Sequence, residues 1–256
     1  MFEVNLKLHE GELLALVGES GSGKSVTSLA IMQLIPNLKS LLDSGEIWFN
    51  NKGLKTALHK LDDSEMRAFR AKDIAMIFQE PMTALNPSMT CGRQVFEAIK
   101  QHLNLSDSAN KKRCLELFKS VELPDPKRIY SAYPHQLSGG QKQRLMIAMA
   151  LSCEPKILIA DEPTTALDVT VQKEVLNLIK RLQKKHQMAC LFISHDLELV
   201  KEVADSIAVM QKGVIVENKT TKEIFANPTH PYTQALLACR PRITKNLKVL
   251  ATVNDF

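Results

Sequence analysis

The chain of 256 residues has no hydrophobic stretch long enough to cross a membrane. Its apolar runs are short, as at residues 13–17 and 157–160, whereas a membrane-spanning helix needs about 20 consecutive apolar residues. The N-terminus also lacks the basic start, apolar centre and small-residue cleavage site that together mark a secretion signal. We therefore expect a soluble globular protein of the cytoplasm.

Cysteine is scarce, and no two cysteines are close in sequence. The five cysteines stand at positions 91, 114, 153, 190 and 239. Without a Cys-x-x-Cys pair, the sequence lacks the spacing that is typical of cysteine-bound metals and of dithiol redox centres. We expect reduced and mostly buried thiols, as is usual in a cytosolic protein.

Positive charge is not concentrated in any one segment, although the net charge is +5. The densest basic clusters, Lys111-Lys112-Arg113 and Lys180-Arg181, lie within helical patterns. This placement is typical of solvated helix faces. The sequence also has no internal repeat and no low-complexity tract. We therefore expect no nucleic acid among the partners of this protein.

Short apolar segments alternate with helical patterns along much of the chain. We predict strands at residues 13–17, 44–50, 74–78, 157–160 and 191–194, and a hairpin of residues 206–210 and 214–217. We predict helices at residues 24–34 and 196–204, along the stripe of Val171, Val175, Leu178, Ile179 and Leu182, and after Thr220. Thr220 and Glu223 have the spacing of a capping box. The alternation predicts an α/β core that is built on a parallel sheet.

A mainly helical region, from residue 91 to residue 152, interrupts this alternation. Asn86-Pro87 and Pro124-Asp125-Pro126 discourage regular structure within and before it. We predict a single domain, with a core of residues 1–85 and 155–228, an inserted helical subdomain of residues 86–154 and a C-terminal extension of residues 229–256. A small antiparallel β part accompanies the core.

The segment Gly18-Glu19-Ser20-Gly21-Ser22-Gly23-Lys24-Ser25 is a complete G-x-x-x-x-G-K-S loop between a predicted strand and a predicted helix. Glycines let the backbone curve around phosphates, successive N–H groups form an anion nest, and the helix N-terminus adds positive charge. The motif therefore predicts a P-loop nucleotide site. We expect Lys24 to contact the β- and γ-phosphates and Ser25 to bind Mg²⁺, with the phosphates cradled by Gly18, Ser20, Gly21, Ser22 and Gly23.

An acidic pair, Asp161-Glu162, follows the predicted strand at residues 157–160. A carboxylate at the rim of the sheet suits the Mg²⁺ shell, so we assign Asp161 to the metal. The next residue, Glu162, is then placed to orient an attacking water and to accept its proton. Together with the loop, this pair predicts a nucleotide hydrolase rather than a mere nucleotide binder.

The segment Leu137-Ser138-Gly139-Gly140-Gln141-Lys142-Gln143-Arg144 resembles the signature of ABC ATPases. Its Gly-Gly pair opens a predicted helix, whose free N–H groups and dipole can face an anion. In that family the signature binds the γ-phosphate that a second ATPase subunit holds. The resemblance therefore implies that Ser138, Gly139 and Gly140 contact ATP across a dimer interface.

Other family elements occur in the expected order. Gln79 resembles the Q-loop glutamine, which touches Mg²⁺ and the attacking water and relays the nucleotide state to the membrane partner. Ala166-Leu167-Asp168 resembles the D-loop, which places Asp168 at the dimer interface. His195 resembles the switch histidine that contacts the γ-phosphate. The resemblance thus implies ATP and Mg²⁺ as cofactors, with Glu162, His195 and Gln79 as catalytic residues.

Two segments are similar to those of oligopeptide, dipeptide and nickel importers, namely residues 78–87 around the Q-loop and residues 227–233, Asn-Pro-Thr-His-Pro-Tyr-Thr. The resemblance implies an ATPase that powers uptake of peptides, or of nickel or another small solute. Its partners would be a second ATPase subunit, identical or different, and permease subunits, with a solute-binding protein acting indirectly. It would lie peripherally on the cytoplasmic face of the cell membrane.

Two alternatives stay open. One is an ABC ATPase that remodels ribosomes or DNA, although the long heptad insertion of DNA-repair types and a second cassette are not found. The other is a regulatory module that does not hydrolyse ATP, against which Glu162 and His195 argue.

Phe2 lies too close to the loop to be assigned as the aromatic residue that stacks on adenine in the family. The chain is then either short at its N-terminus or holds adenine differently, which predicts weakened nucleotide affinity. Cys239 stands alone, so we expect no iron–sulfur cluster.

Overall fold

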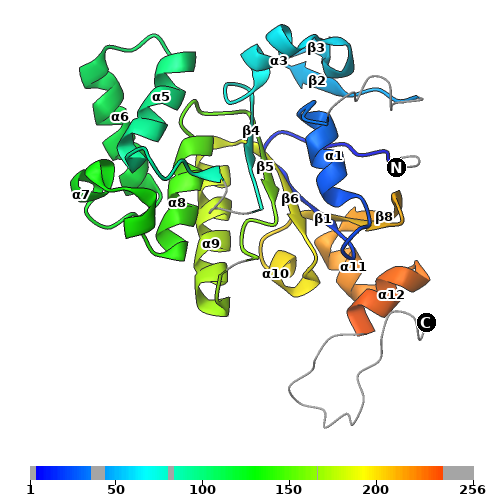
Figure 1. Cartoon of the computed structure of the whole chain (residues 1–256). Helices are drawn as coiled ribbons and strands as arrows, with labels where there is room; N and C mark the ends of the chain where they lie inside the picture. The colour runs from blue at the N-terminus through cyan, green and yellow to red at the C-terminus, as the bar shows by residue number, and fades with distance from the viewer. Residues whose placement is uncertain (1–3, 36–43, 80–83, 166, 239–256) are drawn as a thin grey trace.

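The computed structural model describes residues 4–35, 44–79, 84–165 and 167–238 (Figure 1). The strands are β1 (Leu13–Val17), β2 (Trp48–Asn51), β3 (Leu54–Ala57), β4 (Ile74–Ile77), β5 (Ile157–Asp161), β6 (Ala189–Ser194), β7 (Ser206–Gln211) and β8 (Val214–Thr220). The α-helices are α1 (Lys24–Ile31), α3 (Asp63–Phe69), α5 (Cys91–His102), α6 (Asp107–Ser120), α7 (Pro126–Ser131), α8 (Gly139–Ala150), α9 (Val169–His186), α10 (Leu197–Lys201), α11 (Thr221–Ala226) and α12 (Pro231–Ala238). Short 3-10 turns are η1 (Leu58–Lys60) and η2 (Pro134–Gln136). No helix in these described ranges has both the length and the apolar character that crossing a bilayer requires.

Six strands form one sheet in the order β4-β5-β6-β1-β7-β8. Neighbouring strands are parallel from β4 to β7, and β8 is antiparallel to β7. Strands β2 and β3 form a separate antiparallel hairpin. Helices α5 to α8 follow one another between β4 and β5 and form the helical subdomain (Figure 1). The predicted α/β fold, with its inserted helices and small antiparallel part, is therefore confirmed.

Strand β1 lies inside the sheet between β6 and β7, and all five of its residues are buried. Successive side chains of a strand point to opposite faces. Leu13, Ala15 and Val17 join a hydrophobic core that also contains residues of α8, α9 and α12. Leu14 and Leu16 join a second core that contains residues of β2, η1 and α3. The sheet thus has covered faces on both sides, which is why β1 is apolar throughout.

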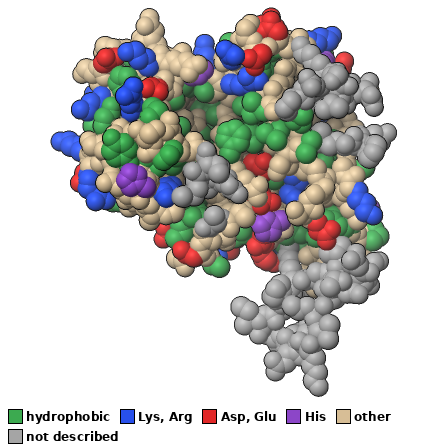
Figure 2. Space-filling model, in the orientation of Figure 1, with side chains coloured by type: hydrophobic (Ala, Val, Ile, Leu, Met, Phe, Trp, Pro, Cys, Tyr) green, Lys and Arg blue, Asp and Glu red, His purple; other side chains and the backbone are tan. Residues whose placement is uncertain are grey.

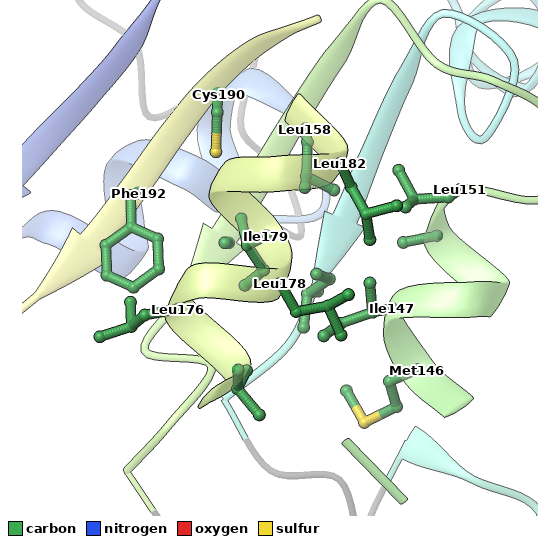
Figure 3. Packing of buried hydrophobic residues seen from close by; sticks show 14 of the residues in the cluster. Met146, Ile147, Leu151, Leu158, Leu176, Leu178, Ile179, Leu182, Cys190 and Phe192 are labelled. Atoms are coloured by element: carbon green, nitrogen blue, oxygen red, sulfur yellow. The ribbon is translucent and has the colours of Figure 1, made fainter. Parts of the chain in front are cut away.

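Helix α9 covers one face of the sheet and also carries the helical subdomain. Figure 3 shows α9 between helix α8 and strand β6, which carries Phe192. On the side facing α8, Leu178 and Leu182 lie toward Ile147 and Leu151. Full burial of one such side chain stabilises the folded state by about 1.5–3 kcal/mol. This apolar interface therefore attaches the inserted helices firmly to the core.

Two of the predicted element boundaries are corrected in the part of the chain before β4. The strand predicted at residues 44–50 begins only at Trp48, because its pairing with β3 starts there, opposite Ala57, and Gly45 has a φ of 119°, outside the extended region. It pairs with β3, which the hydrophobic pattern did not predict, through a turn in which Lys52 and Gly53 both have positive φ. Such a turn matches the twist of paired antiparallel strands. The helix predicted at residues 24–34 ends at Ile31, because the chain turns to a φ of 50° at Gln33.

Two predictions concern the end of the core. The helix predicted at residues 196–204 covers only Leu197–Lys201, since the chain then tightens and Val203 N–H donates to the carbonyl of Val200. The capping box predicted for Thr220 and Glu223 is confirmed at the start of α11. Each wrong boundary is a helix or strand end, where local backbone contacts decide the outcome rather than the hydrophobic pattern.

Candidate nucleotide-binding site

The loop between β1 and α1 passes very close to strand β7. A Cβ atom on Gly18 would lie 2.2 Å from the carbonyl oxygen of Met210, so no other residue fits there without a backbone shift. Gly23, which precedes α1, has a φ of 108°, a value that residues with a side chain rarely adopt. Between them, Ser20 and Gly21 form the exposed outer part of the loop. The loop therefore curves directly into the N-terminus of α1, whose first backbone N–H groups have no partner within the helix and attract anions.

Lys24, the first residue of α1, lies against the carbonyl groups of this loop. Lys24 is only 4% exposed, and its Nζ donates hydrogen bonds of 2.8 Å to the carbonyl oxygens of Gly18 and Glu19. Burial lowers the pKa of Lys24, and the carboxylates of Glu162, Asp161 and Glu19 oppose this shift. An ammonium group that is held only by carbonyl oxygens can exchange them for phosphate oxygens, which bind it more strongly.

Asp161, the last residue of β5, contacts the first turn of α1. Its Oδ1 accepts a hydrogen bond of 3.0 Å from Ser25 Oγ, and its Oδ2 accepts one of 3.2 Å from Ser28 Oγ. Burial raises the pKa of Asp161; the two serine hydroxyls act in the opposite direction, and Glu162 adds to the rise. A buried carboxylate beside a serine hydroxyl presents the oxygen ligands that Mg²⁺ prefers.

This arrangement does not enclose a metal by itself. Across the described ranges, no group of three or more His, Cys, Asp or Glu side chains is arranged to hold a metal ion. Mg²⁺ is usually bound through one or two carboxylates, with water and substrate phosphates as further ligands. Ser25 and Asp161 fit that mode, whereas the amide of Gln79 contacts Glu162.

Glu162 gathers three polar side chains around one carboxylate oxygen. Its Oε2 lies 3.2 Å from Gln79 Nε2, 2.9 Å from Thr165 Oγ1 and 3.2 Å from His195 Nδ1. Gln79, Glu162 and His195 each follow one of the adjacent parallel strands β4, β5 and β6, so the sheet delivers them to the same edge. Glu162 also has a φ of 42°, a conformation that costs energy in a residue other than glycine. Its side chain is 12% exposed, so the surroundings hold it in place.

The start of α8 lies away from the phosphate loop. Ser138 caps this helix: its Oγ accepts a 3.3 Å hydrogen bond from Gln141 N–H, and Gln141 Oε1 accepts one of 3.1 Å from Ser138 N–H. In Figure 1, α1 and α8 lie on opposite sides of β4, β5 and β6. Among the hydrogen bonds of the described residues, none joins residues 138–140 to residues 18–25. The two predicted phosphate-binding segments therefore do not meet within one chain.

Asp168 lies beside the signature helix rather than beside the phosphate loop. It caps α9, with Oδ1 accepting a hydrogen bond of 3.0 Å from Val171 N–H. A Cβ atom on Gly140 would lie 3.0 Å from Val171 Cγ1, and one on Gly139 would lie 3.6 Å from Leu167 Cδ2. The exposed start of α8 and the start of α9 are thus neighbours on the surface. Phe2, Ala166 and Cys239 lie outside the described residues.

An unpaired group in the loop tests whether a phosphate fits there. Ser22 Oγ is buried and has no hydrogen-bond partner within the described ranges. A buried hydroxyl without a partner costs about 1–3 kcal/mol. A phosphate oxygen in the loop would supply that partner, so residues 18–25 fit the phosphates of a nucleotide.

The structure adds three side chains to which the sequence analysis gave no role in the site, although Tyr232 lies in the segment 227–233 that resembles the importers. Ser28 lies three residues after Ser25 on α1, so helical spacing was the signal that could have identified it. Thr165 contacts Glu162 from three residues further along the chain. Tyr232 reaches the loop from α12, where its hydroxyl accepts a hydrogen bond of 3.0 Å from Glu19 N–H. No local pattern marks this last contact.

A parallel sheet whose strand ends carry a phosphate loop and an acidic pair defines a P-loop nucleotide-binding protein. The profile of the family described as "ABC transporter" matches residues 1–165, and that of "Oligopeptide/dipeptide transporter, C-terminal region" matches residues 216–255. The chain belongs to the ABC transporter family, as one of its ATP-hydrolysing subunits. The predicted family and class of enzyme are therefore confirmed.

Individual relatives agree with this assignment. The chain is 51% identical over 243 residues to the dipeptide transport ATP-binding protein DppD of Bacillus subtilis. The aligned residues cover 95% of this chain and 71% of the relative. It is 52% identical over 240 residues to the oligopeptide transport ATP-binding protein OppD of the same species, covering 94% of this chain and 66% of the relative. The solved dimeric, post-hydrolysis structure of the ATP-binding cassette MJ0796 with ADP and Pi superposes with a TM-score of 0.72 at 31% identity, over 85% of this chain and 89% of that one.

Proposed function

We propose that this chain binds and hydrolyses ATP, with Mg²⁺, to power an ABC importer of peptides. One observation supports this proposal most strongly. Three features meet at one edge of the sheet: the phosphate loop, Asp161, and the cluster of Glu162, Gln79 and His195. About half-identity to dipeptide and oligopeptide transport proteins supports the class of solute, as does the matching C-terminal region.

Each residue of the site has a role that its position supports. The backbone of residues 18–25 and the Lys24 ammonium bind the phosphates. Ser25 and Asp161 would hold Mg²⁺, which when bound offsets negative charge on the phosphate oxygens. Gln79 would join them only after its amide turns away from Glu162. Glu162 accepts the proton of the attacking water, because its carboxylate is confined but is still open to solvent on one side. Gln79 and His195, which both contact Glu162, hold the geometry and sense whether the terminal phosphate is present.

A second ATPase subunit, identical or different, completes the site in this proposal. Ser138, Gly139 and Gly140 are exposed or half-exposed and lie away from the chain's own loop. The first N–H groups of α8 and the helix dipole favour an anion there. Head-to-tail pairing would bring each α8 start to the partner's γ-phosphate, with Asp168 beside it. Closure of the pair would exclude water from both sites and strengthen these contacts.

The permease subunits are the proposed membrane partners, and the solute-binding protein would act through them. Hydrophobic side chains gather in the middle of the face shown in Figure 2, between the helical subdomain and the part that carries α3 and the β2–β3 hairpin. Phe78, 42% exposed, directly precedes Gln79. An apolar contact beside Gln79 would let the permease respond to the nucleotide. The chain would then sit peripherally on the cytoplasmic face of the membrane.

The nucleotide part of this proposal is tested by Lys24→Ala, with Lys112→Ala on the exposed face of α6 as the matched control. Isothermal titration with Mg²⁺-ATP should show that Lys24→Ala loses tight binding, because the phosphate charge loses its buried ammonium partner, whereas the control binds normally. Equal affinity of the two variants would refute the assignment of the loop.

The transport part needs a different test. The chain should be purified from gently solubilised membranes of its own organism, and the proteins that accompany it identified. Recovery of a permease and a second ATPase, together with loss of labelled-dipeptide uptake in cells that carry Glu162→Gln, is the expected result. Recovery with ribosomes or DNA and without membrane protein would refute the importer assignment.

A further inference from the structure

The C-terminal helix α12 makes direct contact with the phosphate loop. The Tyr232 hydroxyl accepts a hydrogen bond of 3.0 Å from Glu19 N–H, which joins residues 213 positions apart. Tyr232 is only 4% exposed, and its ring belongs to the main hydrophobic core. Burial raises the pKa of Tyr232, so the phenol is neutral at physiological pH. The contact is therefore a shielded hydrogen bond between neutral groups.

The main chain of Glu19 is held on both sides of its α-carbon. Tyr232 fixes the N–H of Glu19, and Lys24 Nζ binds its carbonyl oxygen at 2.8 Å. In the proposed function, Lys24 turns toward the phosphates and leaves this carbonyl. The contact from Tyr232 uses a different atom of Glu19, so movement of the lysine does not by itself break it. Further along the loop, Gly213 N–H donates to the carbonyl of Ser22 at 2.8 Å, so neighbouring structure supports the loop at two points.

A buried carboxylate fixes the chain that leads into α12. Glu217 on β8 accepts hydrogen bonds from Thr229 N–H (2.9 Å), Thr229 Oγ1 (2.8 Å) and His230 N–H (3.1 Å). His230 Nδ1 in turn accepts a hydrogen bond of 3.2 Å from Tyr232 N–H. Burial raises the pKa of Glu217, but hydrogen bonds from Lys219 and from the backbone of Thr229 and His230 outweigh burial and hold the pKa well below its ordinary value. The carboxylate is therefore ionised and anchors the segment before Tyr232.

We infer that Tyr232 is a positioning residue of the ATP site: through the main chain of Glu19 it keeps the phosphate loop in its nucleotide-binding shape, and Glu217 keeps Tyr232 in place. This inference rests on the proposed function. A separate family profile matches the C-terminal region. Under this inference, that region contributes to the affinity for ATP. The loop is used alike in the ground state and the transition state, so Tyr232 acts on binding and not on the chemical step.

The test compares Tyr232→Phe with Tyr130→Phe in the purified chain. Both changes remove one phenolic hydroxyl and keep the ring, and Tyr130 lies half-buried on α7 in the helical subdomain. Loss of one neutral hydrogen bond should raise the Kd for Mg²⁺-ATP by roughly 2- to 10-fold. The KM for ATP should rise with it while kcat stays at the wild-type value. Tyr130→Phe should change neither quantity.

A double-mutant cycle tests the anchor. Glu217→Gln should raise the Kd for ATP in the wild-type background and add little in the Tyr232→Phe background, because both changes act through the same contact. Full additivity would overturn the role of Glu217, and an unchanged Kd in Tyr232→Phe would overturn that of Tyr232. The Lys24→Ala variant separates these failures from failure of the proposed function: if it also binds ATP normally, the loop itself is misassigned.

Discussion

Replacing Glu162 with glutamine should stop ATP turnover and leave ATP binding intact. Oε2 of Glu162 accepts hydrogen bonds from Gln79 Nε2 and Thr165 Oγ1, and its side chain is 12% exposed. Glutamine has the same length and keeps one acceptor oxygen, so these contacts can persist. The substitution removes the negative charge and the capacity to take a proton.

The expected loss follows from the assigned role of Glu162. A positioned general base contributes about 10²- to 10⁴-fold to a rate, which corresponds to roughly 3–5 kcal/mol of activation free energy at 1.36 kcal/mol per tenfold change. The affinity for ATP, by contrast, should not decrease. Glu162 places a negative charge near Lys24, where it opposes the lowering of the lysine pKa. Its removal leaves a more positive site, so the Kd for ATP should stay equal or fall.

The assay is phosphate release at saturating Mg²⁺-ATP, with ATP affinity measured by titration on the same preparation. Glu116→Gln, on the exposed side of α6, makes the same chemical change away from the site and should behave as wild type. A Glu162→Gln rate within about tenfold of wild type would refute general-base catalysis by this residue. Loss of ATP binding would show instead that Glu162 supports the shape of the site.

Two further outcomes follow from the same geometry. Ser138→Arg should leave ATP binding by the isolated chain intact but block ATP-driven dimerisation in sedimentation experiments, since the start of α8 serves the partner's nucleotide; persistent dimers would contradict the cross-interface assignment. Because the folded-state pKa of Glu217 lies below the ordinary 4.5, its contribution to the free energy of unfolding should be complete at neutral pH and lost as the pH falls below that value. The difference in Tm between wild type and Glu217→Gln should therefore shrink on acidification, and a difference that grows would contradict the anchor.

The phosphate loop could be predicted because its determinants are local. Glycines, a lysine and a serine at fixed spacing between a strand and a helix specify a backbone shape without help from distant residues. The sequence also placed Glu162 and His195 each after a predicted strand, but it did not predict their contact, which depends on the adjacency of β5 and β6 in the sheet. Residues at the carboxyl ends of neighbouring strands meet whatever the details of packing.

Features that depend on distant or weakly patterned residues could not be predicted. Strand β3 was not predicted because its side chains are exposed or half-buried and show no alternation of apolar and polar residues. The contact of Tyr232 with Glu19 depends on how α12 docks after 213 residues, and the local sequence carries no sign of that distance. The short lengths of α1 and α10 were set by single backbone turns rather than by side-chain periodicity.

Oε2 of Glu162 contacts three side chains, and each of them stands where a segment of the chain leaves the sheet. Gln79 starts the connection toward the helical subdomain, Thr165 leads to Asp168 and α9, and His195 leads into α10. A change in charge at this oxygen would therefore be felt by three outgoing segments at once. The strands that carry these segments are joined to one another by parallel pairing, so the contacts that depend on Glu162 lie at the edge of the sheet and not within it.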